Sequence, residues 1–417
     1  MSIETTSLNF SFPDLPCNLD MLPTSAYLVG GAVRDAFLGR KGTYLDLDFV
    51  VPEKSVETAQ QIARYHHAGF VVLDEARQIA RVVFPEGTLD FALQEGATLD
   101  KDLRRRDFTI NAIAYNLRQR QAIDPLGGIA DLRRGIIRMV SPQNLKDDPL
   151  RLLRAYRQAA QLGFQIDEQT RTEIRLLAPL IGNIAAERVQ SEFNYILGHD
   201  LGNKWLRYAY EDGLVTPWFP AVNQEKIAEI ELVTDAAQYL ARRWNGFGAG
   251  VPKWLELAKL ATLVTQEPET AESELERLKY SRSHIRSVTA TVKHLLYLES
   301  LSSPLSLREQ YFFFLEAKKI FPILATRALA IDIHPSILFP LIERYLDPHD
   351  LVVNPQQLLT GNDLLKELQL QPSPMIGYLL TEIKIAHIEG KVNNQKSAIK
   401  FAKLLSDSVD KNDYLGN

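Results

Sequence analysis

The pattern of hydrophobic and polar positions divides the chain into two parts. Between about residues 26 and 140, short apolar runs rich in β-branched residues alternate with Gly and Pro, which predicts strands. One segment among them, SVETAQQIARYHHAG, has the periodicity of a helix instead. The runs predicted as strands are AYLVGG, LDLDFVV, FVVL, ARVVF, TLDFAL and IIRMV. This part is therefore predicted to be a small α/β or α+β domain.

After Pro142 the strand patterns end, and amphipathic segments such as KIAEIELVTDAAQYLARRW follow one another. Gly and Pro separate them, and no repeat of fixed period is present. We therefore predict an α+β protein in which a head with a small mixed or antiparallel sheet precedes an all-α neck, body and tail. The predicted ranges are an N-terminal extension at 1–25, the head at 26–140, the neck at 141–205, the body at 206–330 and the tail at 331–417.

A glycine pair where a strand meets a helix forms the first candidate site. The apolar run AYLV leads into Gly30 and Gly31, and the predicted helix AVRDAFLG follows directly. Glycines let backbone N–H groups approach a ligand, and a helix N-terminus carries partial positive charge. Arg34 can bind the same anion with two hydrogen bonds. The joint is a candidate phosphate site, although such a glycine pair is also common as a plain turn.

Two aspartates on one predicted strand form the second candidate site. In LDLDFVV, the alternation of a strand places Asp46 and Asp48 on one face and the apolar residues on the other. Adjacent carboxylates repel each other unless they share a cation, and Mg²⁺ prefers such oxygen ligands. Asp90 lies in a similar run, LDFA. Each of these could be the solvent face of an edge strand, but three carboxylates beside an anion site suit two-metal phosphoryl transfer.

Two basic segments follow the carboxylates. RRRDFTINA holds Arg106, a carboxylate at Asp107 that can bind a ribose hydroxyl, and an amide at Asn111; the alternative is a helix-capping segment with exposed arginines. DDPLRLLRAYR begins a predicted helix on which arginines recur every three residues on one side. Its candidate residues are Asp148, Arg151, Arg154 and Arg157.

Composition limits the class of protein. The 417 residues are 46% hydrophobic and 24% charged, as in globular proteins, and no apolar run approaches the roughly 18 residues of a membrane span. Cys17 is the only cysteine, which excludes disulfide frameworks and cysteine-based zinc sites. The first ten residues lack a signal-peptide pattern, so we expect a cytoplasmic protein. The net charge of −5 gives no overall sign of nucleic-acid binding, but the arginines cluster after the carboxylates.

Six strings, in this order and at these intervals, resemble the class II tRNA nucleotidyltransferase and bacterial poly(A) polymerase family. They are LVGGAVRD, LDLDFVV, RRDFTINA, DPLGG, DDPLRLLRAYR and AERV, and they cover roughly residues 26–195. The resemblance implies that Asp46 and Asp48 bind two catalytic Mg²⁺ ions, with Mn²⁺ as an alternative, and that Asp90 assists. It also implies that Gly31 and Arg34 bind phosphate, and that Arg106 and Asp107 contact ribose and phosphate.

The family resemblance also assigns base selection to the segment from Asp148 to Arg157. Asp148 can accept from an exocyclic amine while Arg151 donates to the neighbouring ring atom, a pattern that cytosine and adenine offer and uracil and guanine do not. The implied partners are the acceptor stem and elbow of tRNA, CTP and, as a second nucleotide, ATP. The predicted tail is implied to bind the RNA, and no membrane is involved.

A short interval distinguishes this chain within the family. Only the fourteen residues FALQEGATLDKDLR separate Asp90 from Arg105. Family members that add the whole CCA triplet, and the poly(A) polymerases, have a longer flexible loop here, and its deletion marks enzymes that add two cytidines and leave adenosine to a separate A-adding enzyme. We therefore expect CC addition. The alternatives are full CCA addition, then adenosine-only addition or poly(A) synthesis, and, from another class, a non-catalytic RNA-binding protein with the same fold.

Overall fold

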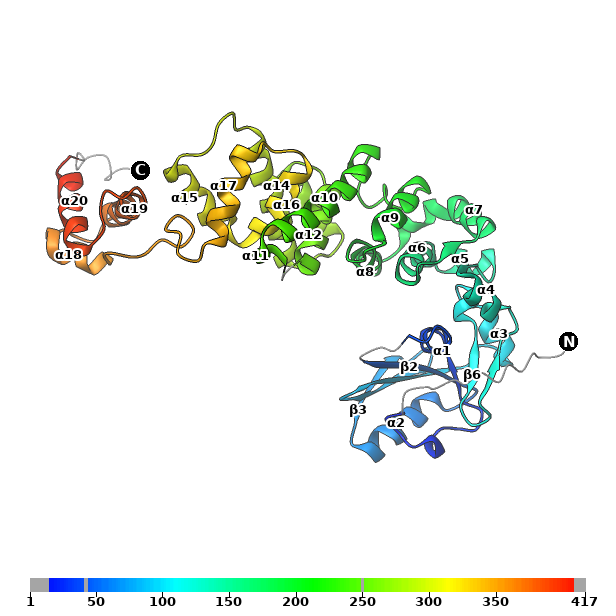
Figure 1. The fold of residues 1–417 in the computed structure, drawn as a ribbon. Coiled ribbons are helices and arrows are strands. Elements are labelled where there is room, and N and C mark those ends of the chain that lie inside the picture. Colours follow the sequence, from blue (N-terminus) through cyan, green and yellow to red (C-terminus); the bar gives the residue numbers. More distant parts are fainter. Residues whose placement is uncertain (1–14, 41–43, 249–250, 409–417) are drawn as a thin grey trace. The chain divides into compact units, whose positions relative to one another are not determined.

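The computed structural model describes residues 15–40, 44–248 and 251–408 (Figure 1). The chain forms two compact units, Met1–Trp218 and Phe219–Asn417, and each is described by itself below. The predicted head lies in the first unit and the predicted tail in the second. The predicted limit between neck and body, at 205/206, falls inside helix α9 (Gly202–Glu211).

A mixed sheet forms the head, as predicted, and in the described residues its strand order is β3-β4-β5-β2-β1-β6-β7. β2 and β5 are parallel, and the other neighbours are antiparallel. The strands are β1 (Tyr27–Val29), β2 (Leu45–Val51), β3 (Gly69–Asp74), β4 (Ile79–Phe84), β5 (Gly87–Leu93), β6 (Ala114–Asn116) and β7 (Gln121–Ile123). The sequence predicted β1 from the apolar run before its glycine pair but did not predict β6 and β7, which are equally short.

The strand predicted at IIRMV is confirmed only in part. Ile136–Ile137 forms β8 and pairs with β9 (Gln165–Ile166), and Met139 forms an isolated antiparallel bridge with Phe108, so neither pairing is part of the head sheet. The backbone groups that follow have other partners. The amide of Met139 donates to Thr170 Oγ1 at 3.0 Å, and that of Val140 donates to the carbonyl of Asp107 at 3.1 Å.

One face of the sheet is a hydrophobic core covered by α2 (Ser55–His66), at the position of the predicted helix. Phe49 and Phe91 stack there with ring centroids 5.2 Å apart, and Ile62 of α2 is fully buried. Because strand residues alternate, this core forces Asp46 and Asp48 onto the opposite face. Figure 1 shows α1 (Gly31–Phe37) on the other side of the sheet from α2.

Helices follow the sheet in the first unit. α6 carries the arginine row and buries Leu153, Tyr156 and Ala160 against α8 and α9, and Gly163 in the left-handed conformation (φ 72°) ends it. The helices after the sheet's fifth strand are α3 (Leu99–Arg104), α4 (Gly128–Arg134), α5 (Pro142–Asp147), α6 (Leu150–Leu162), α7 (Glu168–Leu177) and α8 (Ala186–Leu197), then α9. Short 3₁₀ turns are η1 (Leu19–Met21), η2 (Thr109–Asn111) and η3 (Ala178–Asn183).

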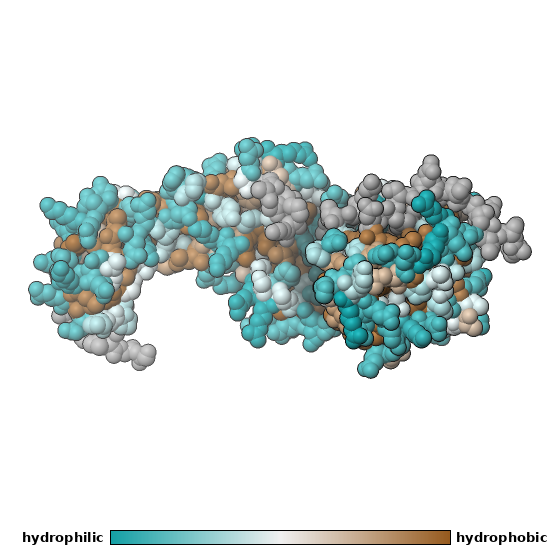
Figure 2. All heavy atoms as spheres, turned by 90° about the horizontal axis from the view of Figure 1, so that it is seen from below, coloured by the Kyte–Doolittle hydropathy of each residue, from teal (hydrophilic) through white to brown (hydrophobic). Residues whose placement is uncertain are grey.

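The second unit is helical throughout its described residues, as predicted. One core includes Phe314 and Phe321, and a smaller one includes Leu364 and Leu379 of the last helices. Its elements are α10 (Gln224–Arg243), α11 (Asn245–Gly248), α12 (Val251–Leu263), α13 (Pro268–Arg277), α14 (Arg282–Glu299), α15 (Leu307–Ala317), η4 (Lys318–Ile320), α16 (Phe321–Ala330), α17 (Pro335–Leu346), α18 (Gly361–Leu368), α19 (Pro374–Ile388) and α20 (Gln395–Ser408). Hydrophilic side chains cover much of the face seen in Figure 2. Over the described ranges, no helix is both long and apolar enough to span a bilayer.

Candidate active site

Three carboxylates lie on the face of the sheet that α2 leaves uncovered. The parallel register of β2 and β5 places Asp48 beside Asp90 and Asp46 beside Thr88. The Thr88 hydroxyl donates to Asp46 Oδ1 at 2.7 Å. Residues at paired positions of neighbouring strands project from the same face, so strand pairing assembles this carboxylate group.

Asp90 is paired with a residue that the sequence analysis missed. Arg81 of β4 lies beside Asp90 in the register and donates to it from Nε at 2.7 Å and from Nη2 at 2.8 Å. Both oxygens of Asp90 are therefore engaged, whereas Asp46 and Asp48 have no arginine partner at this distance among the described residues. The β-hairpin alternation of ARVVF and TLDFAL was the signal that could have revealed Arg81.

The pKa of the Asp48 carboxyl group is raised above its ordinary value. Its side chain remains accessible to solvent, but the protein around it displaces much of its hydration. This desolvation, with the charges of Asp46 and Asp90, raises the pKa of Asp48 to about 6, against the opposing effect of Arg106. The ionised form is thus held at an electrostatic cost that a bound cation would relieve.

The donor set fits a divalent ion that shares its ligands with a substrate. Within residues 15–40, 44–248 and 251–408, no cluster of three or more His, Cys, Asp or Glu side chains forms a metal site by itself. Asp46 and Asp48 supply two carboxylates, and Mg²⁺ is commonly held by one or two carboxylates completed by substrate phosphates and water.

The glycine turn lies directly against the carboxylates. Gly30 has φ 74° and ψ −138°, a conformation open essentially to glycine alone. A Cβ atom built on it would lie 3.4 Å from Asp48 Oδ2 and 3.5 Å from Arg106 Nη1, so this turn touches both residues. Gly31, the next residue, begins α1.

Arg34 is bound within the protein rather than free. It donates to Asp35 from Nε at 2.8 Å and from Nη2 at 3.0 Å, and from Nη1 to Asn111 Oδ1 at 3.0 Å. Its side chain is only 15% exposed. Arg34 therefore links α1 to the segment that contains Asn111.

A hydrogen-bond network continues from Asn111 to α6. Asn111 Nδ2 donates to Asp107 Oδ1 at 2.9 Å and to Gln158 Oε1 at 3.0 Å, and Arg154 pairs with Asp107 Oδ2 at 2.9 Å. Burial alone would raise the pKa of Asp107, but Arg154 and Asn111 outweigh it and hold that pKa below its ordinary value. The carboxylate is thus kept ionised and oriented between head and neck.

A cleft of about 290 Å³ lies between these segments, and every residue that lines it is charged. Its lining is Arg105, Arg106, Asp107, Asp148, Arg151, Arg154 and Arg188. Five arginines against two aspartates give a formal charge of 5 − 2 = +3, which suits a polyanion such as a triphosphate. Arg106 bonds Asp102 at 3.2 Å from Nη2, while its Nε is buried without a partner among the described residues. That Nε–H is a donor in need of an acceptor.

Of the four residues predicted around α6, the structure brings three into the cleft. Asp148, Arg151 and Arg154 line it, whereas Arg157 turns to α8 and pairs with Glu192 at 2.6 Å. Arg188 lines the cleft and was not among the predicted site residues, although it belongs to the AERV string.

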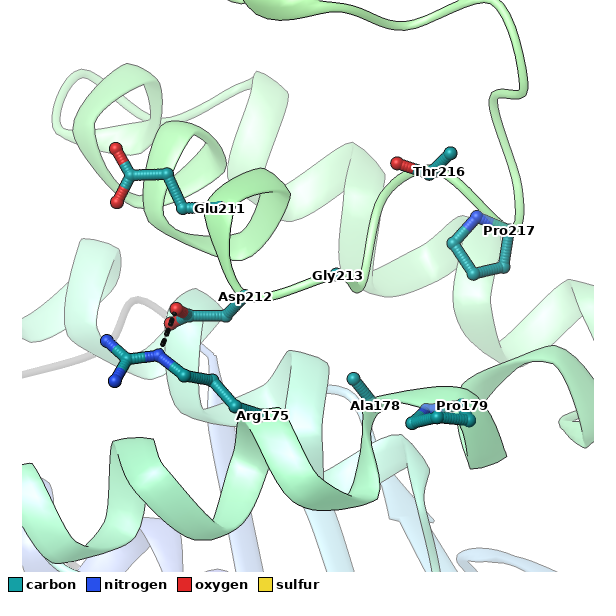
Figure 3. Close-up of a pocket in the computed structure, with 8 residues that line it drawn as sticks. All are labelled: Arg175, Ala178, Pro179, Glu211, Asp212, Gly213, Thr216 and Pro217. Carbon is teal, nitrogen blue, oxygen red and sulfur yellow. Dashed lines mark hydrogen bonds and ion pairs between the residues drawn. The ribbon is translucent and has the colours of Figure 1, made fainter.

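A second network anchors the opposite side of α6. The Tyr156 hydroxyl donates to Asp212, which also accepts from Arg171 Nε at 2.6 Å and from Arg175 Nε at 2.7 Å. Figure 3 shows Arg175 reaching Asp212 while Glu211 points away, at the edge of a cavity of about 630 Å³. α6 is therefore fixed on both sides, with Arg151 and Arg154 toward the cleft.

Comparison with protein families matches successive parts of the chain. The poly(A) polymerase head domain matches residues 26–95 and 88–138, the RNA- and SrmB-binding site of polymerase A matches 163–226, and domain 2 of tRNA nucleotidyltransferase matches 253–402. A CC-adding tRNA nucleotidyltransferase from Synechocystis sp. is 51% identical over 402 residues, which cover 94% of this chain and 97% of that protein. A CCA-adding enzyme from Lactiplantibacillus plantarum is 30% identical over 92% of this chain and 93% of its own.

Solved structures of related enzymes have the same fold. The Thermotoga maritima CCA-adding enzyme complexed with tRNA aligns with a TM-score of 0.70 at 24% identity, over 92% of this chain and 91% of that one. A CCA-adding enzyme in complex with CTP aligns with a TM-score of 0.71, also at 24% identity, over 92% and 91%.

Proposed function

The chain belongs to the tRNA nucleotidyltransferase and poly(A) polymerase family, and from this premise we propose that it adds CMP from CTP to the 3′ end of tRNA and stops after two cytidines. The reaction forms a bond between the tRNA 3′-oxygen and the α-phosphorus of CTP. The bond from that phosphorus to the pyrophosphate breaks, and the hydroxyl proton passes to solvent. A separate A-adding enzyme would then complete the CCA end.

The observation that carries CC addition is the connection between β5 and α3. β5 ends at Leu93 and α3 begins at Leu99, so only residues 94–98 join them. Contacts hold this connection closed: the Glu95 amide donates to Asp102 Oδ1 at 3.1 Å, and the Glu95 carboxylate pairs with Arg105. No room remains for the flexible loop of CCA-adding relatives. Two relatives with the CC-adding name support the same conclusion, one at 51% identity over 94% of this chain and one at 44% identity over 40% of it.

In the proposed mechanism Asp46 and Asp48 would hold two Mg²⁺ ions, for which Mn²⁺ could substitute. When bound, such ions lower the pKa of the attacking hydroxyl and neutralise charge on the phosphates. Asp90 assists indirectly. Because Arg81 neutralises it, only Asp46 and Asp48 carry unpaired negative charge on this face in the described residues. Arg106 lines the cleft and binds the triphosphate through its guanidinium group, and Asp107 accepts from the ribose hydroxyl.

Base selection is assigned to Asp148 and Arg151, which line the same cleft as Arg106. Their carboxylate and guanidinium match the amine and the ring acceptor of cytosine. The second unit, whose residues 253–402 match domain 2 of tRNA nucleotidyltransferase, is proposed to hold the acceptor stem and elbow of tRNA. Such contacts depend on shape and backbone and need no base reading.

The test of the product uses tRNAs that end before CCA, after C and after CC. Each is offered CTP and ATP, singly and together, and the products are resolved to one nucleotide. We expect two cytidines from the first tRNA, one from the second, and no extension of the third. Efficient adenosine addition to the third tRNA would contradict CC-only activity.

The test of the active site replaces Asp46 by Ala. We expect metal-dependent CMP incorporation to fall by at least about 10³-fold, because one of two ion ligands is lost. Asp235→Ala, on the exposed face of α10, is the matched control and should keep normal activity. Incorporation that persists in Asp46→Ala would favour a different catalytic centre, and a wild-type chain that only binds tRNA would favour the non-catalytic alternative.

A further inference from the structure

Arg188 fixes the carboxylate of Asp148 from a neighbouring helix. It lies on α8, and it donates from Nη1 to Oδ1 at 3.2 Å and from Nη2 to Oδ2 at 2.9 Å. This two-bond pairing matches a planar guanidinium to a planar carboxylate, so it sets both the position and the rotation of the acid. Asp148 precedes Pro149, which keeps the Asp148 backbone extended (φ −138°, ψ 90°). The backbone and Arg188 together determine where the carboxylate points.

Arg151 has partners of its own. Its Nη1 donates to the carbonyl of Arg105 at 2.8 Å and to the carbonyl of Asn144 at 3.2 Å. Arg151 and Asp148 line the same cleft, where desolvation lowers the pKa of Arg151 and the charges of Asp107 and Asp148 oppose that effect. Opposite charges on side chains of one cleft attract each other and can form a direct ion pair if nothing restrains them. In the described structure each side chain is instead held by a different partner.

We propose that Arg188 is a positioning residue that keeps Asp148 from pairing with Arg151, so that both remain available to the base of the incoming nucleotide. This inference rests on the proposed function, in which those two residues read cytosine. Each oxygen of the Asp148 carboxylate has two lone pairs, and Arg188 engages one lone pair on each oxygen. The others can accept from the N4 amine of cytosine. Without Arg188, Asp148 and Arg151 would bond to each other instead of to the base.

An ion pair one turn along α8, between Glu192 and the arginines of α6, holds the helix that carries Arg188. Glu192 lies four residues after Arg188, on the same side of the helix, and accepts from Arg157 Nε at 2.6 Å. Arg154 approaches the same carboxylate at 4.0 Å. α8 therefore presents a cation to Asp148 and an anion to the arginines of α6. Because Glu192 is buried, these pairs fix α8 along α6.

The test replaces Arg188 by Met, which keeps the length of the side chain and removes its charge. We expect the KM for CTP to rise about tenfold and the preference for CTP over UTP to fall by a similar factor, while the KM for tRNA is unchanged. Arg188→Lys keeps the charge but not the two-bond pairing, so an intermediate loss is expected. Arg64→Met, at an exposed arginine of α2, is the control and should match the wild type.

Inhibition by inorganic tripolyphosphate separates base positioning from phosphate binding. The inhibition constant should rise by less than about twofold in Arg188→Met, although the cleft loses one of its five arginines. An inhibition constant that rises together with the KM for CTP would overturn the proposal, and so would an unchanged preference for CTP over UTP. Affinities for CTP and UTP are also measured by calorimetry, without catalysis. A wild-type chain that binds CTP selectively but does not extend tRNA would contradict the proposed function alone.

Discussion

Asp212 is expected to be the polar residue on which the packing of α6 depends most. Its side chain is 1% exposed, and it accepts hydrogen bonds from Tyr156 and from two arginines, Arg171 and Arg175. Asp212→Asn keeps the shape of the side chain and removes its charge. Two guanidinium groups then lose the carboxylate that compensates them, and Tyr156 loses a charged acceptor.

The expected magnitude follows from how far the partners are buried. Removing one member of a buried ion pair costs about 3–5 kcal/mol. Here Arg171 is 20% exposed and Arg175 is 44% exposed, so water can solvate part of the charge that is left behind. The amide of Asn also retains weaker hydrogen bonds. We therefore expect a loss of about 2–3 kcal/mol, which for a unit of this size lowers the Tm by about 5–10 °C.

The matched control is Glu211, the residue before Asp212, which pairs with the same arginine, Arg171. Glu211 accepts from Arg171 Nη2 at 3.1 Å but is 46% exposed, so Glu211→Gln should cost less than about 0.5 kcal/mol. Urea unfolding gives the free energies, and hydrogen exchange in α6 reports the local effect. Equal losses in the two variants, or no loss in Asp212→Asn, would refute the reasoning.

The comparison of the wild type with Asp212→Asn also predicts how the stability changes with pH. Burial opposes ionisation of Asp212, but hydrogen bonds from Arg171, Tyr156 and Arg175 outweigh it, so its pKa in the folded chain lies below the ordinary value of 3.8. The stabilisation is therefore full well above pH 3.8 and is lost as the pH falls through the lower, folded-state pKa. The difference between wild type and Asp212→Asn should shrink only in that acidic range. A difference that instead disappeared near neutral pH would contradict the assignment.

Three further substitutions test other parts of the molecule. Gly30→Ala should lower CMP incorporation at least about tenfold, because the backbone beside the carboxylates must shift from its glycine-only conformation, whereas Gly182→Ala, in open space, should not. Asp102→Asn should lower kcat/KM for CTP about tenfold in steady-state assays, since it loosens Arg106. Arg308→Met breaks a two-bond ion pair to a carboxylate on α19, so the KM for tRNA should rise about fivefold and that for CTP should stay constant.

Much of the head could be predicted because its signals are local. Strand alternation in LDLDFVV places Asp46 and Asp48 together whatever the rest of the chain does. The fourteen-residue interval after Asp90 limits the connection between β5 and α3 by chain length alone, and the structure has five residues there. The sequence patterns failed mainly for short strands. β6 and β7 were missed because neither runs directly into a glycine pair or contains a long apolar run, and IIRMV pairs with β9 and Phe108 rather than joining the head sheet as one strand.

The sequence by itself determined which residues share a face, because helix and strand periodicity is a property of the backbone. Only the tertiary structure decided which partner each charge meets. Arg81 neutralises Asp90 because β4 pairs with β5, and Arg188 reaches Asp148 because α8 packs along α6. Arg157 has the spacing of a cleft residue, yet it turns to α8. Ion pairs between distant segments depend on packing, and packing is settled by the summed burial of many side chains rather than by any local pattern.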